Sequence, residues 1–149
     1  MSLVLHEQRG PALWITINRE ERRNAMNEAV MAGIAEGFTL AATDPSVRAV
    51  VLTGTGTRAF CAGADLSASA GSFKYDYSRV GLPFVRLMKQ ARDLTVPLIA
   101  RVNGHTMAGG MGLLGMCDMA IGADHALFGM PEVKVGVFPM QIDRKSTRL

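Results

Sequence analysis

The sequence predicts an α/β fold in which strands alternate with helices. Short apolar runs rich in β-branched residues, such as residues 49–53, are typical of strands that are covered on both faces. Segments with apolar residues at helical spacing lie between these runs, and two glycine-rich segments (residues 59–66 and 102–112) follow two of them. This order of strand, helix, strand and glycine turn indicates crossover connections between parallel strands.

The first elements are predicted by their hydrophobic patterns. Residues 3–5 and 12–17 flank an Arg-Gly-Pro turn, and the alternation in the second run predicts a hairpin with one buried face. Residues 24–42 are predicted to form an amphipathic helix that ends at Asp44-Pro45. Its apolar positions, spaced by four, are Met26, Val30, Ile34 and Phe38.

The later elements follow the same logic. Residues 67–80 show little periodicity and are predicted to form a loop, whose aromatic side chains either line a pocket or pack on the domain. Strands are predicted at residues 97–102 and 119–122, and a helix start at residues 111–116. The helix between the loop and the first of these strands has an apolar face of Phe84, Leu87, Met88 and Ala91.

Composition excludes several classes of protein. A chain of 149 residues fits one domain, and the apolar stretch at residues 102–117 is too short and too rich in glycine to span a membrane. The N-terminus lacks the pattern of a secretion signal. Two cysteines without a CxxC motif, and three histidines without ligand spacing, predict reduced thiols, a cytoplasmic protein and no metal site.

A net charge of +3 could suggest a nucleic-acid partner, but the distribution of the charge along the chain predicts none. Residues 143–149 contribute three positive charges and one negative charge, a net of +2, so the rest of the chain carries about +1. The remaining cluster of Arg19, Arg22 and Arg23 fits either a solvated turn before a helix or a contact with a ligand phosphate.

The two glycine-rich segments point to chemistry on an acyl group. Each offers backbone N–H groups with little side chain in the way, and two converging N–H donors can hold a carbonyl oxygen as it becomes an oxyanion. A nucleotide site is disfavoured, because the chain has no GxxxxGK[ST] motif and Gly54-x-Gly56 lacks the third glycine of the dinucleotide fingerprint. Tight packing of a helix on a strand also explains glycines at residues 109–112.

A series of motifs in one order resembles the crotonase superfamily, the enoyl-CoA hydratases and isomerases, and the resemblance runs from about residue 3 to residue 139. The motifs are Ile17-Asn18-Arg19, Asn24-Ala25-Met26, Val51-Leu52-Thr53-Gly54, Phe60-Cys61-Ala62-Gly63-Ala64-Asp65-Leu66, Val102-Asn103-Gly104, Ala108-Gly109-Gly110, Cys117-Asp118 and Phe128-Gly129-Met130-Pro131-Glu132. The resemblance implies a crotonase-like spiral of ββα units. It also implies an acyl-CoA thioester as the partner, coenzyme A as part of the substrate with no other cofactor, and a homotrimer or homohexamer for the full-length form.

The resemblance implies site residues as well. The N–H groups of Ala64 and Gly109 would form the oxyanion hole, and a wider set would border the substrate. That set is Ala62, Gly63, Ala64, Asp65, Leu66, Ser67 and Gly110. Hydratases often have a lysine at the position of Ser67, so this chain departs from them there.

The residues at the acid–base positions differ further from those of the family's hydratases. Hydratases of this family place two glutamates around the substrate, and the corresponding positions here are Gly112 and Glu132. One carboxylate can still move a proton, so double-bond isomerisation fits better than hydration, although hydration with the water held otherwise stays open. Asp65 and Asp118 are interpreted as satisfying backbone groups, and His105 as packing at the turn.

The chain is predicted to consist of one incomplete domain and a short tail. Residues 1–142 are assigned to a crotonase-like acyl-CoA-binding domain that lacks the family's C-terminal helices. Residues 143–149 resemble a translated sequencing adaptor and are predicted to be a non-native tail. The rival to an enzyme is a non-catalytic acyl-CoA-binding paralogue or an inactive fragment.

Overall fold

The computed structural model describes residues 2–66 and 82–135. The predicted loop at residues 67–80, the site position Ser67 and the predicted tail at residues 143–149 lie outside these ranges. No helix of the described ranges is long and apolar enough to cross a membrane.

The larger sheet has five strands in the order β1-β2-β3-β5-β7. Strands β1 (Val4–Arg9) and β2 (Ala12–Ile17) form the predicted antiparallel hairpin. Strands β3 (Ala49–Gly54), β5 (Leu98–Val102) and β7 (Met119–Gly122) run parallel to β2, and β3 pairs with β2 on one side and β5 on the other. Strands β3, β5 and β7 confirm the apolar runs read from the sequence.

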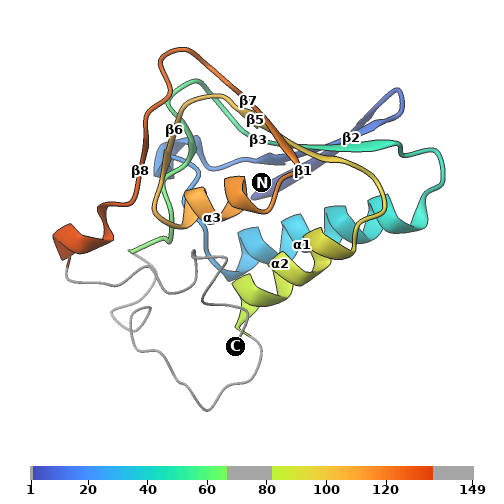
Figure 1. Cartoon of the computed structure of the whole chain (residues 1–149), viewed down its shortest axis with the longest axis horizontal. Helices are drawn as coiled ribbons and strands as arrows, with labels where there is room; N and C mark the ends of the chain where they lie inside the picture. The colour runs from blue at the N-terminus through green and yellow to red at the C-terminus, as the bar shows by residue number, and fades with distance from the viewer. Residues whose placement is uncertain (1, 67–81, 136–149) are drawn as a thin grey trace.

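A second, smaller sheet was not predicted. It consists of the short parallel strands β4 (Ala59–Cys61), β6 (His105–Met107) and β8 (Phe128–Gly129), in the order β4-β6-β8. Each follows a strand of the larger sheet and precedes a helix, so that β3-β4, β5-β6 and β7-β8 are successive turns of one spiral. This arrangement confirms the predicted α/β fold with ββα units (Figure 1).

Helices α1 (Glu28–Thr43) and α2 (Pro83–Asp93) lie side by side against one face of the larger sheet (Figure 1). The core lies between them and the sheet. Its fully buried members include Ile15, Ile17, Val30, Ile34, Val50, Leu52, Leu87 and Leu98. The remaining helices are the short α3 (Gly109–Gly115) and two single turns, η1 (Glu20–Arg22) and η2 (Pro131–Val135).

Helix α1 begins four residues after the predicted start at residue 24. The side chain of Asn27 accepts a hydrogen bond of 2.9 Å from the N–H of Val30 and caps the helix there. Asn24 lies in the left-handed region with φ of 55°, which a helix cannot accommodate. Met26 is buried as its spacing predicted, but it pairs with a neighbouring segment instead of lying in the helix.

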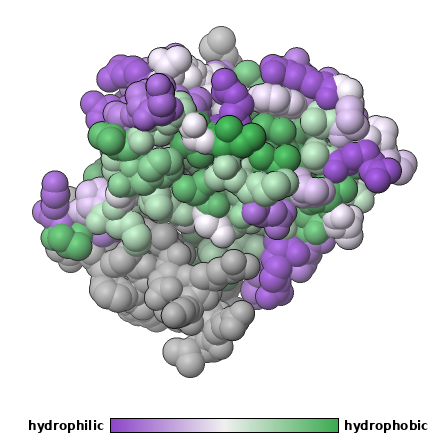
Figure 2. Space-filling view, turned by 45° about the horizontal axis from the view of Figure 1, so that its top comes forward, coloured by the Kyte–Doolittle hydropathy of each residue, from purple (hydrophilic) through white to green (hydrophobic). Residues whose placement is uncertain are grey.

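Several large apolar side chains are exposed on β7 and around β8. The exposed fraction is 70% for Ile121 and 51% for Phe128. In Figure 2, apolar residues gather across the middle of the visible face, with hydrophilic side chains along its upper and right-hand rim.

Candidate active site

The first glycine-rich segment is held by the residues that precede α1. The N–H of Met26 donates to the carbonyl of Gly63 (2.8 Å), and the N–H of Asp65 donates to the carbonyl of Met26 (2.7 Å). These two bonds form a parallel bridge between Met26 and Ala64. In such a bridge the middle residue directs its own N–H to the opposite side. The N–H of Ala64 therefore points away from Met26.

The second glycine-rich segment packs against the first. A Cβ atom on Gly63 would lie 3.2 Å from the nitrogen of Gly109, and a Cβ atom on Gly109 would lie 3.6 Å from the nitrogen of Ala64. Gly63 also has a φ of 98°, which residues with a side chain rarely adopt. The fold thus brings together the two segments whose N–H groups the sequence assigned to an oxyanion hole.

The residue before Gly109 has a strained backbone. Ala108 has φ of 50° and ψ of −122° and stands at the N-cap of α3. Its N–H donates to the carbonyl of Gly129 (2.9 Å), and its own carbonyl accepts from Met111 (2.8 Å). Strained backbone of this kind is concentrated at functional sites, because surrounding structure must hold it in place.

Close packing of α3 against Cys61 requires a glycine at position 110. A Cβ atom there would collide with the backbone oxygen of Cys61 and lie 3.0 Å from the Cys61 Cβ. Of the glycines that begin α3, Gly110 therefore fits the alternative of tight helix–strand packing, whereas Gly109 faces the first segment.

Glu132 is buried, and its carboxylate has no partner among the residues that the structure describes. It lies in η2, 9% of its surface is exposed, and neither carboxylate oxygen has a hydrogen-bond partner in the described part of the chain. Because an unpaired buried carboxylate is costly, proteins retain one where its chemistry is used. The pairing of β8 with β6 positions it: η2 begins two residues after Gly129, which binds Ala108.

Position 112 supplies no second carboxylate. Gly112 is a buried residue of α3, three residues after Gly109. Of the two glutamate positions assigned from the sequence, position 132 therefore carries a carboxylate and position 112 does not.

Comparison with known proteins places this architecture in a family. The family model for enoyl-CoA hydratase/isomerase matches residues 7–146. The chain belongs to the enoyl-CoA hydratase/isomerase family. It is 35% identical over 125 residues to (E)-benzylidenesuccinyl-CoA hydratase of Thauera aromatica, covering 82% of this chain and 47% of that protein. It is 34% identical over 139 residues to 2,3-dehydroadipyl-CoA hydratase of Escherichia coli, covering 93% and 53%.

Solved structures of the same family have the same fold. A putative enoyl-CoA hydratase/isomerase (crotonase) from Legionella pneumophila has a TM-score of 0.88 at 30% identity, over 99% of this chain and 58% of that one. AtuE of Pseudomonas aeruginosa has a TM-score of 0.81 at 35% identity, over 94% and 55%. The chain spans about half the length of the relatives it matches.

Two buried asparagines support the site of this family member, and the sequence reading gave them no role. The Asn24 amide nitrogen donates to the carbonyl of Ala59 (2.7 Å), and its oxygen accepts from the N–H of Arg19 (3.1 Å). Asn103 donates to the same Ala59 carbonyl (3.1 Å) and accepts from the N–H of Gly54 (3.0 Å). Both lie in the motifs given above. An asparagine beside an apolar run is the sequence signal that could have indicated their roles.

The arginine cluster divides in the structure. Arg22 and Arg23 are exposed at the turn before α1, as the solvated-turn alternative predicts. Arg19 is buried, and its Nη2 lies 2.7 Å from Oδ2 of Asp65, with exposed side-chain fractions of 10% and 6%. The Asp65 carboxylate therefore faces the interior and not the space beside Ala64.

Asp118 satisfies a backbone group as predicted, whereas His105, predicted to pack at the turn, is exposed and bonds to the backbone there. Oδ2 of Asp118 accepts a bond of 2.8 Å from the N–H of Leu98, and Nδ1 of His105 accepts one of 3.2 Å from the N–H of Leu127. Burial raises the pKa of the Cys61 and Cys117 thiols to about 12, so both are protonated at neutral pH.

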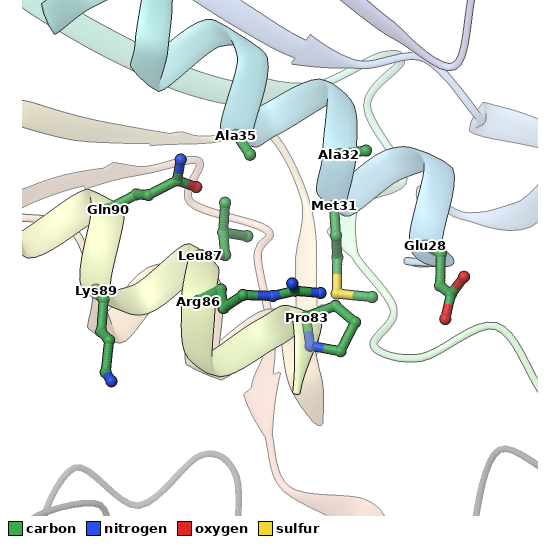
Figure 3. Close-up of a pocket in the computed structure, with 9 residues that line it drawn as sticks. All are labelled: Glu28, Met31, Ala32, Ala35, Pro83, Arg86, Leu87, Lys89 and Gln90. Carbon is green, nitrogen blue, oxygen red and sulfur yellow. The ribbon is translucent and has the colours of Figure 1, made fainter. Parts of the chain in front are cut away.

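A groove of about 610 Å³ lies elsewhere, between α1 and α2. Met31 projects from α1, Leu87 and Arg86 from α2, and the Arg86 side chain extends toward Met31 (Figure 3). None of the residues assigned to the oxyanion hole or to proton transfer lines it.

Proposed function

We propose that this chain binds an acyl-CoA thioester, stabilises its enolate and moves a proton on an enoyl-CoA. The N–H groups of Ala64 and Gly109 hold the thioester oxygen, and Glu132 is the general base and acid. Coenzyme A enters as part of the substrate, and no other cofactor is needed. The full-length form acts as a homotrimer or homohexamer in the cytoplasm.

The buried carboxylate of Glu132, which has no hydrogen-bond partner within residues 2–66 and 82–135, carries this proposal. A single positioned carboxylate contributes about 10²–10⁴-fold to a proton transfer. Loss of one oxyanion-hole donor costs roughly 10²–10³-fold in rate, because negative charge develops on the oxygen only as the enolate forms. The two contributions act on different atoms of the substrate and can be removed separately.

The reaction we favour is double-bond isomerisation. It needs one group to take a proton from one carbon and return it to another, and Glu132 can do both. Hydration also needs a water molecule to be oriented, and Gly112 offers no carboxylate for that task.

Hydration is the second candidate, because the names of the matched relatives favour it. Two of them are hydratases of benzylidenesuccinyl-CoA and 2,3-dehydroadipyl-CoA. The acyl groups in those names carry a further carboxylate, so a test of hydration should include such a substrate.

The test incubates the chain in deuterated water with a 3-enoyl-CoA, a 2-enoyl-CoA and 2,3-dehydroadipyl-CoA, and follows products by mass spectrometry. Isomerisation gives the shifted double bond with no gain of water, whereas hydration adds the mass of water. The variant Glu132→Gln should lose turnover by about 10²-fold or more while binding the ester as before. Glu36→Gln, an exposed glutamate of α1, is the matched control.

Turnover that is equal in Glu132→Gln and the parent chain would exclude Glu132 as the proton-transfer group. Ester binding without turnover in the parent chain would favour the non-catalytic alternative. Addition of water to any of the three esters would favour hydration over isomerisation.

A further inference from the structure

Arg19 joins the two backbone segments that form the bridge at Ala64. Its Nη1 donates to the carbonyl of Ala25 (2.7 Å), and its Nη2 donates to Oδ2 of Asp65 (2.7 Å). Ala25 precedes Met26, and Asp65 follows Ala64. One guanidinium group therefore binds both the segment before α1 and the first glycine-rich segment. Its two contacts, Ala25 and Asp65, are each one residue away from the bridged pair.

The Asp65 end of this link is fixed at two points. Its carboxylate receives Arg19, and its N–H donates to the carbonyl of Met26 (2.7 Å). The peptide unit between Ala64 and Asp65 can therefore turn little about the chain axis. The N–H of Ala64 belongs to the peptide unit before it, whose Gly63 carbonyl accepts from the N–H of Met26 (2.8 Å). Its direction therefore depends on the bridge to Met26, because Ala64 is exposed and has no side chain long enough to anchor itself.

The Arg19 end is fixed as well. Its N–H donates to the side chain of Asn24 (3.1 Å), and its carbonyl accepts from the N–H groups of Arg22 and Asn24 (2.9 Å each). An arginine with a restrained backbone and a planar guanidinium group holds its two hydrogen-bond partners in fixed positions better than a flexible lysine does.

We propose that Arg19 is a positioning residue for the acyl-CoA site: by holding Ala25 and Asp65 beside the bridge, it keeps the N–H of Ala64 aimed at the thioester oxygen. The inference rests on the proposed function, since it requires that Ala64 holds that oxygen. A buried ion pair contributes little net stability compared with an apolar pair of similar volume. Stability alone therefore does not account for a buried ion pair between Arg19 and Asp65. Orientation of the Ala64 N–H accounts for it.

The experiment measures hydrogen bonding to the substrate directly. A saturated acyl-CoA labelled with ¹³C at the thioester carbonyl is bound to the chain, and isotope-difference infrared spectroscopy records the carbonyl stretch. Hydrogen bonds from Ala64 and Gly109 should lower this frequency relative to the free ester. Exchange of the α-proton with deuterated water, and the Kd of the ester, are measured on the same samples.

The variants separate orientation from folding. Arg19→Met alone would bury the Asp65 charge without Arg19 and is expected to destabilise the chain, so the main variant is Arg19→Met/Asp65→Leu, which removes both charges. Arg19→Lys keeps the charge but not the two-pronged geometry. Arg92→Met removes an exposed cation whose Nε lies 3.7 Å from Oδ1 of Asp93, and Ile34→Val weakens the core; both serve as controls.

The double variant should lose most of the carbonyl shift, and its α-proton exchange should fall by about 10-fold or more, while Kd changes far less. Arg19→Lys should lie between the double variant and the parent chain. Both controls should keep the parental shift, whatever their melting temperatures.

A double variant that folds and keeps the parental shift would overturn the role of Arg19 and leave the proposed function intact. Loss of the shift in Ile34→Val as well would also overturn it, because a general loss of stability would then explain the effect. A parent chain that binds the ester with no carbonyl shift would overturn the oxyanion hole itself, and this inference with it.

Discussion

Met26 is hydrogen-bonded to the residues on either side of Ala64, through the Gly63 carbonyl at 2.8 Å and the Asp65 N–H at 2.7 Å. This bridge turns the Ala64 N–H away from Met26, and a Cβ atom on Gly109 would lie 3.6 Å from the Ala64 nitrogen. The candidate oxyanion hole is thus a consequence of backbone pairing.

Gly109→Ala should impair the site and leave the fold intact. The added methyl group would meet the mobile end of Met26, 2.9 Å away, and lie 3.6 Å from the nitrogen of Ala64. It would crowd the space that we propose for the thioester oxygen, so we expect α-proton exchange to fall by about 10-fold or more with little change in melting temperature. Exchange at the parental rate would show that this space is not the oxyanion hole.

Gly110→Ala should instead impair the fold. Its methyl group would collide with the backbone of Cys61, which cannot move aside as a side chain can. A loss of about 1–3 kcal/mol in the free energy of unfolding is expected. Gly115→Ala, which would meet nothing within 4 Å, is the control and should gain about 0.5–1 kcal/mol. Denaturant unfolding compares the three; equal stability of Gly110→Ala and the parent would contradict the packing role.

Glu132→Gln should make the chain more stable. Both oxygens of Glu132 are buried, with no partner among the described residues, and a neutral amide costs less to bury than a carboxylate. We expect a gain of about 1–3 kcal/mol in the free energy of unfolding at pH 7, measured by denaturant titration. Glu36→Gln at the surface should change it by less than about 0.5 kcal/mol. A less stable Glu132→Gln would indicate that the carboxylate serves the fold.

Asn103→Ala should destabilise the turn after β3. It removes the acceptor of the Gly54 N–H and the donor to the carbonyls of Gly56 and Ala59, with distances of 2.9–3.1 Å. The Ala59 carbonyl keeps its bond from Asn24, whereas the buried N–H of Gly54 is left unpaired, which should cost roughly 1–3 kcal/mol. Hydrogen exchange at Gly54 should rise in parallel, and unchanged protection there would contradict this role.

Alkaline pH should destabilise the chain through its thiols. The pKa of Cys61 and of Cys117 is raised by burial from 9.0 to about 12. Between pH 9 and 12 the unfolded state loses these protons while the folded state keeps them, so stability falls as the pH rises through this window. Replacing both cysteines with alanine should flatten the fall in melting temperature over that window. An equal fall in the variant would assign it to other groups.

The sequence predicted most of the larger sheet and both long helices, because their apolar spacing reflects burial. It missed the smaller sheet, whose strands of two or three residues show no period. It also placed the start of α1 too early: Met26 continues the helical spacing, yet its burial comes from the bridge to Ala64. A long-range backbone pair of this kind leaves no local pattern.

The candidate site was predicted in part for the same reason. The glycine-rich segments and Glu132 stand out by residue type and by motif order. The buried pair of Arg19 and Asp65, and the shared bonds of Asn24 and Asn103 at Ala59, join residues that are up to about fifty positions apart in the sequence. Their partners become evident only once the fold has brought them together.

The most direct test of the central claim is deuterium exchange at the α-carbon of a saturated acyl-CoA bound to this chain, compared with Glu132→Gln. We expect exchange in the parent chain and a loss of about 10²-fold or more in the variant, at similar ester affinity. Binding of the ester with no exchange in the parent chain, or equal exchange in both, would contradict it.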